Sequence, residues 1–124
     1  MNSLQRMASG ERYLAEVTDQ YMKEMLSKTK HYCVVILRHG PNWDKPGKDK
    51  VLWEHGRRNF ALRRDGLLPI VCPVTDGSEV SGVGIFNGSV KQIKKIMDED
   101  PGVKEGFFAY EIHDCRSFPG ACLP

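Results

Sequence analysis

Two side chains in this sequence have the types and the placement that proton-transfer chemistry needs. His55 lies in a stretch whose apolar residues recur at the three- and four-residue spacing of one helix face, and Asp100 follows a second such stretch. A carboxylate bonded to one imidazole nitrogen fixes the tautomer and leaves the other nitrogen free for general base or acid work near neutral pH. If the two helices lie side by side, His55 and Asp100 form a catalytic dyad. The alternative is a partly buried structural pair, in which Asp100 simply ends its helix before Pro101.

A second group of candidates follows the most apolar stretch of the chain. These residues could line a cleft for a flat, anionic ligand: Arg38, His39, Asn42 and Trp43. A guanidinium pairs with a carboxylate and an indole stacks on a ring, so we predict a substrate-binding role for them. An ordinary loop with one half-buried tryptophan is the alternative.

The same segment contains Arg38-His39-Gly40, a triplet that also occurs in histidine phosphatases, where the histidine becomes the phosphorylated nucleophile. That chemistry needs a second histidine, further arginines and an acid on a larger α/β fold. Phosphatase activity through His39 is therefore the weakest of the functional hypotheses.

The elements that must position these residues follow from hydrophobic periodicity and from turn residues. The pattern predicts two helices, at 50–64 and 90–99, and four strands, at 31–38, 67–74, 80–86 and 104–113. This β-α-β-β-α-β order is that of an α+β, ferredoxin-like unit with a four-stranded antiparallel sheet. Both helices of such a unit cover one face, which brings His55 and Asp100 to the same side of the sheet.

The other sheet face is predicted to carry apolar side chains that no helix covers, so we expect two copies of the chain to pair through it. Residues 1–30 are predicted to form a helical extension, residues 31–113 the domain, and residues 114–124 an irregular tail. Four arginines of the first domain helix are assigned to its solvent side: Arg57, Arg58, Arg63 and Arg64.

The bulk properties exclude several classes of protein. The 124 residues suffice for one domain, and a net charge of +2 gives no basic stripe for nucleic acid. No apolar run is long enough for a membrane span, no secretory signal is visible, and the four cysteines are scattered, so we expect a cytoplasmic protein. His113, Cys115 and Cys122 match no standard zinc spacing, and no cofactor motif is present; we expect neither metal nor cofactor.

Three motifs in order resemble the YciI-like (YCII-related) domain family. They are HYCVVILRHGPNW at 31–43, His55 with Gly66 eleven residues later, and Asp100-Pro101, and the likeness spans 31–119. The resemblance implies a dimeric α/β barrel, related in fold to muconolactone isomerase, with its proposed His–Asp active site falling on His55 and Asp100. Most members are of unknown function, and a few are linked to elimination chemistry on chlorinated aromatic compounds.

This chain departs from the family pattern at one place. Many members carry a basic residue a few positions before the histidine, whereas Leu52, Trp53 and Glu54 stand there in this sequence and Lys50 is the nearest cation. The resemblance therefore assigns no anion-binding residue at that point.

Two function classes remain besides the phosphatase. One is a cofactor-free lyase or isomerase, with His55 moving a proton and Asp100 orienting it, acting on a small aromatic or carboxylated molecule. The other is a non-catalytic dimer that binds a small ligand in the same pocket.

Overall fold

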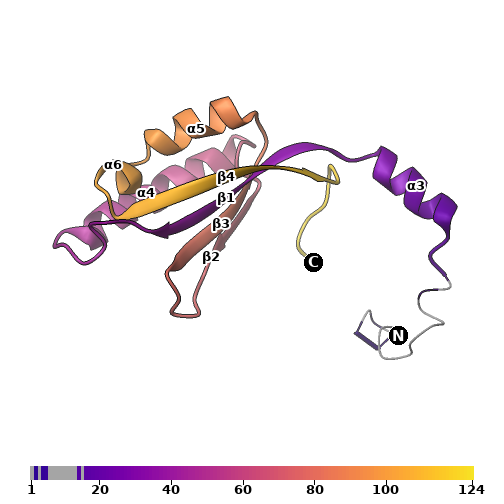
Figure 1. The fold of residues 1–124 in the computed structure, drawn as a ribbon, viewed down its shortest axis with the longest axis horizontal. Coiled ribbons are helices and arrows are strands. Elements are labelled where there is room, and N and C mark those ends of the chain that lie inside the picture. Colours follow the sequence, from indigo (N-terminus) through magenta and orange to yellow (C-terminus); the bar gives the residue numbers. More distant parts are fainter. Residues whose placement is uncertain (1, 3, 6–13, 15) are drawn as a thin grey trace.

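The computed structural model describes residues 2, 4, 5, 14 and 16–124. Its elements are, in order, α3 (Asp19–Ser27), β1 (Lys30–His39), α4 (Lys48–Arg64), β2 (Ile70–Pro73), β3 (Val80–Phe86), α5 (Val90–Asp98), α6 (Pro101–Lys104) and β4 (Phe108–Ser117). The strands form one antiparallel sheet in the order β2-β3-β1-β4. This order, with a helix between β1 and β2 and helices between β3 and β4, confirms the ferredoxin-like α+β fold (Figure 1).

The central strand β1 divides its side chains between the two faces of the sheet. Cys33, Val35 and Leu37 are buried on the face that α4, α5 and α6 cover (Figure 1). There they meet Ile93 and Met97 of α5 in one core. Burial of these apolar side chains provides the main driving force for packing the helices on the sheet.

The opposite face of β1 is apolar too. Val34 lies directly opposite Ile85 of β3, and Ile36 lies opposite Val83. All these side chains are partly exposed in the single chain, and no helix among the described residues covers them (Figure 1). The structure thus leaves an open apolar sheet face, defined here by Val34, Ile36, Val83 and Ile85.

Local signals set the ends of the helices. Gly47 and Gly66 adopt positive φ angles of 87° and 77° just before and just after α4, where glycine avoids the strain of a Cβ. Ser89 caps α5 through a capping box with Gln92. The helix predicted at 90–99 is observed as α5 and ends at Asp98, before Pro101 as expected, and Pro101 then begins the short helix α6, which was not predicted.

The last strand corrects the sequence-based boundaries. We expected a strand at 104–113 and an irregular tail from 114, but β4 runs from Phe108 to Ser117. Residues 104–107 instead end α6 and make the turn at Gly106, and β4 pairs with β1 along the whole length of β1. The polar sequence at the end of β4 hid the strand, because backbone pairing at a sheet edge needs no apolar pattern.

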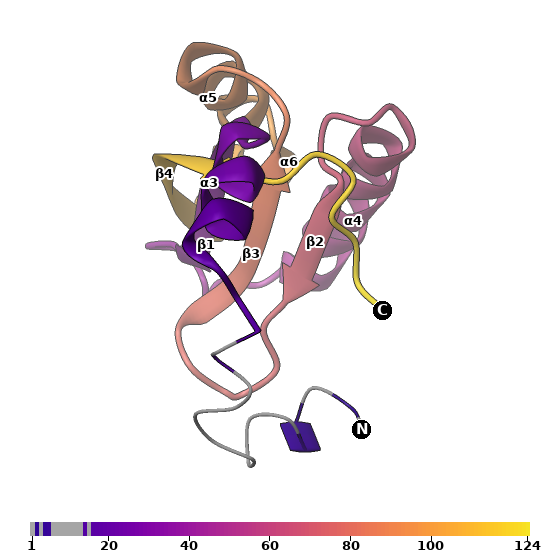
Figure 2. The same cartoon turned by 90° about the vertical axis from the view of Figure 1, so that its right-hand side faces the viewer.

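The N-terminal prediction lies largely outside the described residues. Within them, the predicted 1–30 extension contains α3, which begins after the capping residue Thr18. It lies beyond the end of the sheet and buries none of its residues (Figures 1 and 2). The second predicted strand, 67–74, is shortened to Ile70–Pro73 after Pro69.

Candidate active site

The two predicted dyad residues are in direct contact. His55 projects from the middle of α4 toward the sheet, and Asp100 lies between α5 and α6. The distance from His55 Nδ1 to Asp100 Oδ1 is 2.8 Å. His55 is 14% exposed and Asp100 only 1%, so water screens this contact poorly.

Hydrogen bonds stabilise the Asp100 carboxylate in its buried position. Asp100 is the N-cap of α6, and its Oδ2 accepts the backbone N–H groups of Gly102 at 3.0 Å and Val103 at 3.2 Å. The Arg58 guanidinium lies 3.7 Å from Oδ1. These groups offset the cost of burying a charge and hold the carboxylate in one orientation.

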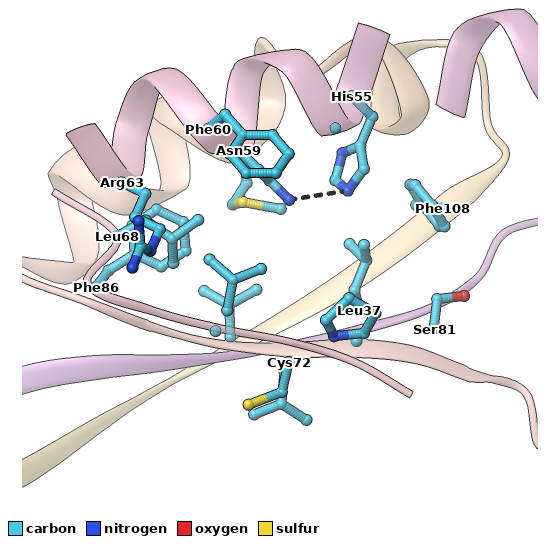
Figure 3. A pocket seen from close by; sticks show the side chains of 18 of the residues that line it. Leu37, His55, Asn59, Phe60, Arg63, Leu68, Cys72, Ser81, Phe86 and Phe108 are labelled. Atoms are coloured by element: carbon cyan, nitrogen blue, oxygen red, sulfur yellow. Dashed lines mark hydrogen bonds between the residues drawn. The ribbon is translucent and has the colours of Figure 1, made fainter. Parts of the chain in front are cut away.

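This arrangement decides the tautomer of His55. The Asp100 carboxylate is an acceptor, so Nδ1 of His55 donates to it and Nε2 carries the lone pair. The Asn59 side-chain amide, one helical turn along α4, donates to Nε2 at 3.2 Å (Figure 3). Nε2 is therefore the basic nitrogen, held in place from both sides of the ring.

A pocket of about 440 Å³ opens beside this nitrogen. It lies between α4 and the sheet, and His55, Asn59, Phe60 and Arg63 line it from the helix side (Figure 3). Leu37, Leu68, Phe86 and Phe108 are among the apolar residues on its other walls. A concave, mostly apolar cavity with a few convergent polar groups is typical of a small-molecule site.

Two glycines of β3 help to make room for this pocket. Gly82 and Gly84 lie opposite Leu37 and Val35 of β1, so side chains at these positions would point toward α4. Both glycines line the pocket. A Cβ on Gly84 would come within 2.9 Å of Leu68, so even alanine would crowd this wall.

Phe108 supports the imidazole from the sheet side. The centroids of the His55 and Phe108 rings lie 4.7 Å apart. Gly102 packs so closely behind this ring that an added Cβ would lie 2.5 Å from Phe108 Cδ2. Phe108, the first residue of β4, and Gly102, in the first turn of α6, thus hold the His55 ring in place beside Asp100.

The four residues predicted to bind substrate lie elsewhere. Their contacts are with other parts of the protein, and none of them lines the pocket. Arg38 donates to Glu111 at 2.8 Å, Asn42 donates to the Glu105 backbone carbonyl at 2.9 Å, and the His39 ring stacks on Trp43 at 3.7 Å. Their role in ligand binding stays a prediction without support from the pocket.

The phosphatase hypothesis also gains no support. Arg38 and His39 are neighbours in β1 and project to opposite faces of the sheet, Arg38 toward Glu111 and His39 toward Trp43. Close packing explains the glycine at position 40 without phosphatase chemistry, because a Cβ there would lie 2.4 Å from the Gly106 carbonyl oxygen.

Sequence reasoning missed several residues of the site. Arg58 and Arg63 were assigned to the solvent side, but Arg58 pairs with Asp100 and Arg63 lines the pocket. Asn59, which bonds to His55, was not among the residues singled out from the sequence. The i, i+4 spacing of His55 and Asn59 could have indicated their hydrogen bond.

Within the described part of the chain, one group of side chains could hold a metal ion, because its potential ligand atoms lie close together. This group consists of His31, Cys33 and Asp114, which do not line the pocket. The combination considered from the sequence does not come together in this way: His113 bonds to Glu111, and Cys122 is exposed in the C-terminal segment.

Among solved structures, eight chains match this chain. No protein-family model matches the chain, and no curated protein matches it. The chain is similar to 5-chloro-2-hydroxyhydroquinone dehydrochlorinase from Burkholderia phenoliruptrix AC1100, in complex with 2,5-dihydroxybenzoquinone, at 17% identity and a TM-score of 0.44, over 65% of this chain and 90% of that chain. The fold assignment rests on the strand order described above. No helix among the described residues has the length and apolar character to cross a bilayer.

Proposed function

We propose that this protein is a small lyase or isomerase that moves a proton through His55 Nε2. One observation carries the proposal: the 2.8 Å contact between His55 Nδ1 and the buried Asp100 carboxylate, which leaves Nε2 as a base beside a pocket. Asp100 acts through His55 as a positioning residue, because it holds the tautomer and stabilises the imidazolium that forms.

The pocket indicates the class of substrate. A volume of about 440 Å³ is near the lower end of the range for small-molecule sites. Its walls are mostly apolar, while His55 and Arg63 reach it at separate places along α4 (Figure 3). A small ring compound with an acidic hydrogen and a carboxylate or phenolate group fits this pattern.

The chemistry then has two steps. His55 Nε2 removes a proton from a carbon or hydroxyl of the substrate, and the electron pair of that bond moves into the substrate. In an isomerase, the imidazolium returns the proton to a different atom; in a lyase, the electron pair expels a leaving group from the neighbouring carbon. The Asn59 amide can shift from Nε2 to the substrate during this transfer.

The same proposal includes membership of the YciI-like family, a homodimer of the dimeric α/β barrel type and a cytoplasmic location. The sequence motifs support the family membership and the open apolar sheet face supports the homodimer, whereas the cytoplasmic location rests on the scattered cysteines alone. The dimer is tested below through its mass.

Hydrogen–deuterium exchange tests the proposed activity without a known substrate. Small aromatic carboxylates and phenols are incubated with the protein in D₂O, and NMR follows loss of carbon-bound hydrogen. We expect exchange in at least one compound, abolished in His55→Gln and reduced about tenfold or more in kcat in Asp100→Asn, where the tautomer is no longer fixed. His113→Gln is the matched control, because His113 also pairs with a carboxylate, Glu111, but lies outside the pocket.

Nitrogen NMR of His55 provides the structural half of the test. We expect a protonated Nδ1 and an unprotonated Nε2 in the wild type, and a mixture of tautomers in Asp100→Asn. Exchange that persists in His55→Gln would contradict the proposal. Ligands that bind in the pocket without exchange in the wild type would replace it with a non-catalytic binding protein.

A further inference from the structure

A second cluster of reactive side chains lies toward the opposite end of β1 from the dyad. His31 and Cys33 are two residues apart on β1, and Asp114 of β4 is the direct cross-strand partner of Cys33. Residues two apart on a strand share a face, and so do directly paired residues. All three side chains therefore project to the face of the sheet that the helices cover.

Their donor atoms are close together. His31 Nε2 lies 2.5 Å from Asp114 Oδ1 and 3.9 Å from Cys33 Sγ, and all three donor atoms lie within 4.8 Å of one another. Cys33 is fully buried, whereas the side chains of His31 and Asp114 are 44% and 70% exposed. The cluster thus has a buried sulfur at its base and an open side toward solvent.

The types of donor select the ion. An imidazole nitrogen, a thiolate and a carboxylate are the ligands of zinc sites, whereas Mg²⁺ and Ca²⁺ prefer oxygen alone. Ligand bonds of 2.0–2.3 Å in a tetrahedron place the donors about 3.3–3.7 Å apart. The observed separations lie on both sides of this range, and the two exposed side chains can adjust to it. We propose that His31, Cys33 and Asp114 bind a zinc ion whose fourth position is open to solvent.

The surroundings of the cluster are compatible with a cation. Arg116 is the cross-strand partner of His31, but its guanidinium is held by the hydroxyl of Thr29 at 3.1 Å and the Thr29 carbonyl at 2.8 Å. The Cys33 thiol donates to the Gly88 carbonyl oxygen, which lies 3.3 Å from Sγ.

The proposed zinc site is separate from the pocket. None of its three ligands lines the pocket, although two neighbours of Cys33 do: Val35, two residues along β1, and Phe86, its cross-strand partner on β3. A bound ion would tie the start of β1 to the end of β4, next to the segment that leads to α3. The inference therefore stands or fails independently of the proposed enzyme activity.

Cobalt and zinc titrations test this site. The protein carries Cys72→Ala and Cys122→Ala, because these two exposed thiols would compete for metal, and it is reduced and dialysed against a chelator. We expect one equivalent of Co²⁺ to bind with a thiolate-to-cobalt charge-transfer band, and Zn²⁺ to displace it. We also expect zinc to raise the thermal unfolding temperature.

Single substitutions assign the ligands. Cys33→Ala should abolish the charge-transfer band, and His31→Ala or Asp114→Asn should weaken zinc binding by about tenfold or more, since even outer-shell losses cost that much. Cys115→Ala and His113→Ala, on the other face of β4, are the controls and should bind zinc like the parent. Cobalt binding without a thiolate band, or unchanged affinity in both His31→Ala and Asp114→Asn, would overturn the inference. His31→Ala and Asp114→Asn alter exposed side chains, so they test the zinc site even if Cys33→Ala fails to fold.

Discussion

At the scale of single residues, Asp100 is the most constrained side chain of the site. It is a buried carboxylate that accepts two backbone N–H groups, bonds to His55 and lies close to Arg58. Its side chain therefore serves two purposes, since the same carboxylate caps α6 and orients the imidazole. Substitutions can separate these two purposes.

We predict that Asp100→Asn lowers the free energy of unfolding by about 1–3 kcal/mol, because the asparagine keeps the cap but loses the charge opposite His55 and Arg58. Asp100→Ala should cost about 2–5 kcal/mol, because it also leaves two backbone donors and the Arg58 charge without their partner. Urea unfolding measures both values. Asp44→Asn, at an exposed loop position, is the control and should stay within about 0.5 kcal/mol of the wild type. Equal costs for the two Asp100 variants would mean that the cap contributes nothing.

Two glycines near the dyad are expected to respond in opposite ways to alanine. Gly56 lies inside α4 and lines the pocket, and a Cβ there meets no atom within 4 Å among the described residues. Gly56→Ala should therefore raise the free energy of unfolding by about 0.5–1 kcal/mol while it narrows the pocket and weakens ligand binding. Gly102→Ala should lower stability by about 1–3 kcal/mol, because its Cβ would overlap Phe108. Thermal unfolding of the two variants beside the wild type is the measurement, and a destabilised Gly56→Ala would contradict the first part.

At the scale of elements, the apolar pattern predicted the fold because each strand and helix has a buried face with its own period. β3 occupies the residues predicted for it, and the periodicity of two helices placed His55 and Asp100 on the same side of the sheet. The end of β4 was missed because its residues are mostly polar and show no alternation of apolar and polar side chains. Only its backbone pairing with β1 makes it a strand.

The residues of the site that were not predicted depend on side-chain positions and on strand register, which the spacing of residues in the sequence does not specify. Arg58 and Arg63 flank the side of α4 that faces the pocket, where periodicity does not decide between solvent and pocket. The closeness of Cys33 and Asp114 depends on the register between β1 and β4, which cannot be known before the true bounds of β4.

The outer face of the edge strand β4 carries an ion-pair network that makes stability depend on pH. Hydrogen bonds from His113 and from Arg38 lower the pKa of the Glu111 carboxyl below its ordinary value. A carboxyl with a lowered pKa in the folded state stabilises the protein above its unfolded pKa, and this contribution is lost as pH falls through the folded pKa.

We therefore predict that Glu111→Gln lowers stability at pH 7, and that its difference from the wild type shrinks to nothing as pH falls into the strongly acidic range. Urea unfolding of both proteins across that pH range provides the measurement. Glu105→Gln, an exposed carboxylate in the turn before β4, is the control and should follow the wild type at each pH. A difference that stays constant with pH would show that packing, and not charge, accounts for the effect of the substitution.

At the scale of the whole molecule, α4, α5 and α6 cover one face of the sheet and leave the other uncovered in the described part of the chain (Figure 1). The uncovered face carries two apolar cross-strand pairs at its centre, Val34 with Ile85 and Ile36 with Val83. Arg38 and Glu111 form a charged pair at the same face. An apolar centre with a polar rim is the usual composition of an interface between protein chains.

We predict that the protein in solution has twice the 14.0 kDa mass of the chain, with two open faces packed on each other. Ile36→Glu places a carboxylate on this face directly opposite Glu111 of β4, and burying two like charges side by side in an interface would cost more than the contact gains. The variant should therefore be a monomer at micromolar concentration, while its helical content, measured by circular dichroism, stays that of the wild type.

Trp53→Glu is the matched control, because Trp53 is 72% exposed on α4 and carries a large apolar side chain away from this face. Size-exclusion chromatography with light scattering gives the masses. A monomeric wild type would remove the interface altogether, whereas a dimer that survives Ile36→Glu but not Trp53→Glu would place the interface on the helical side.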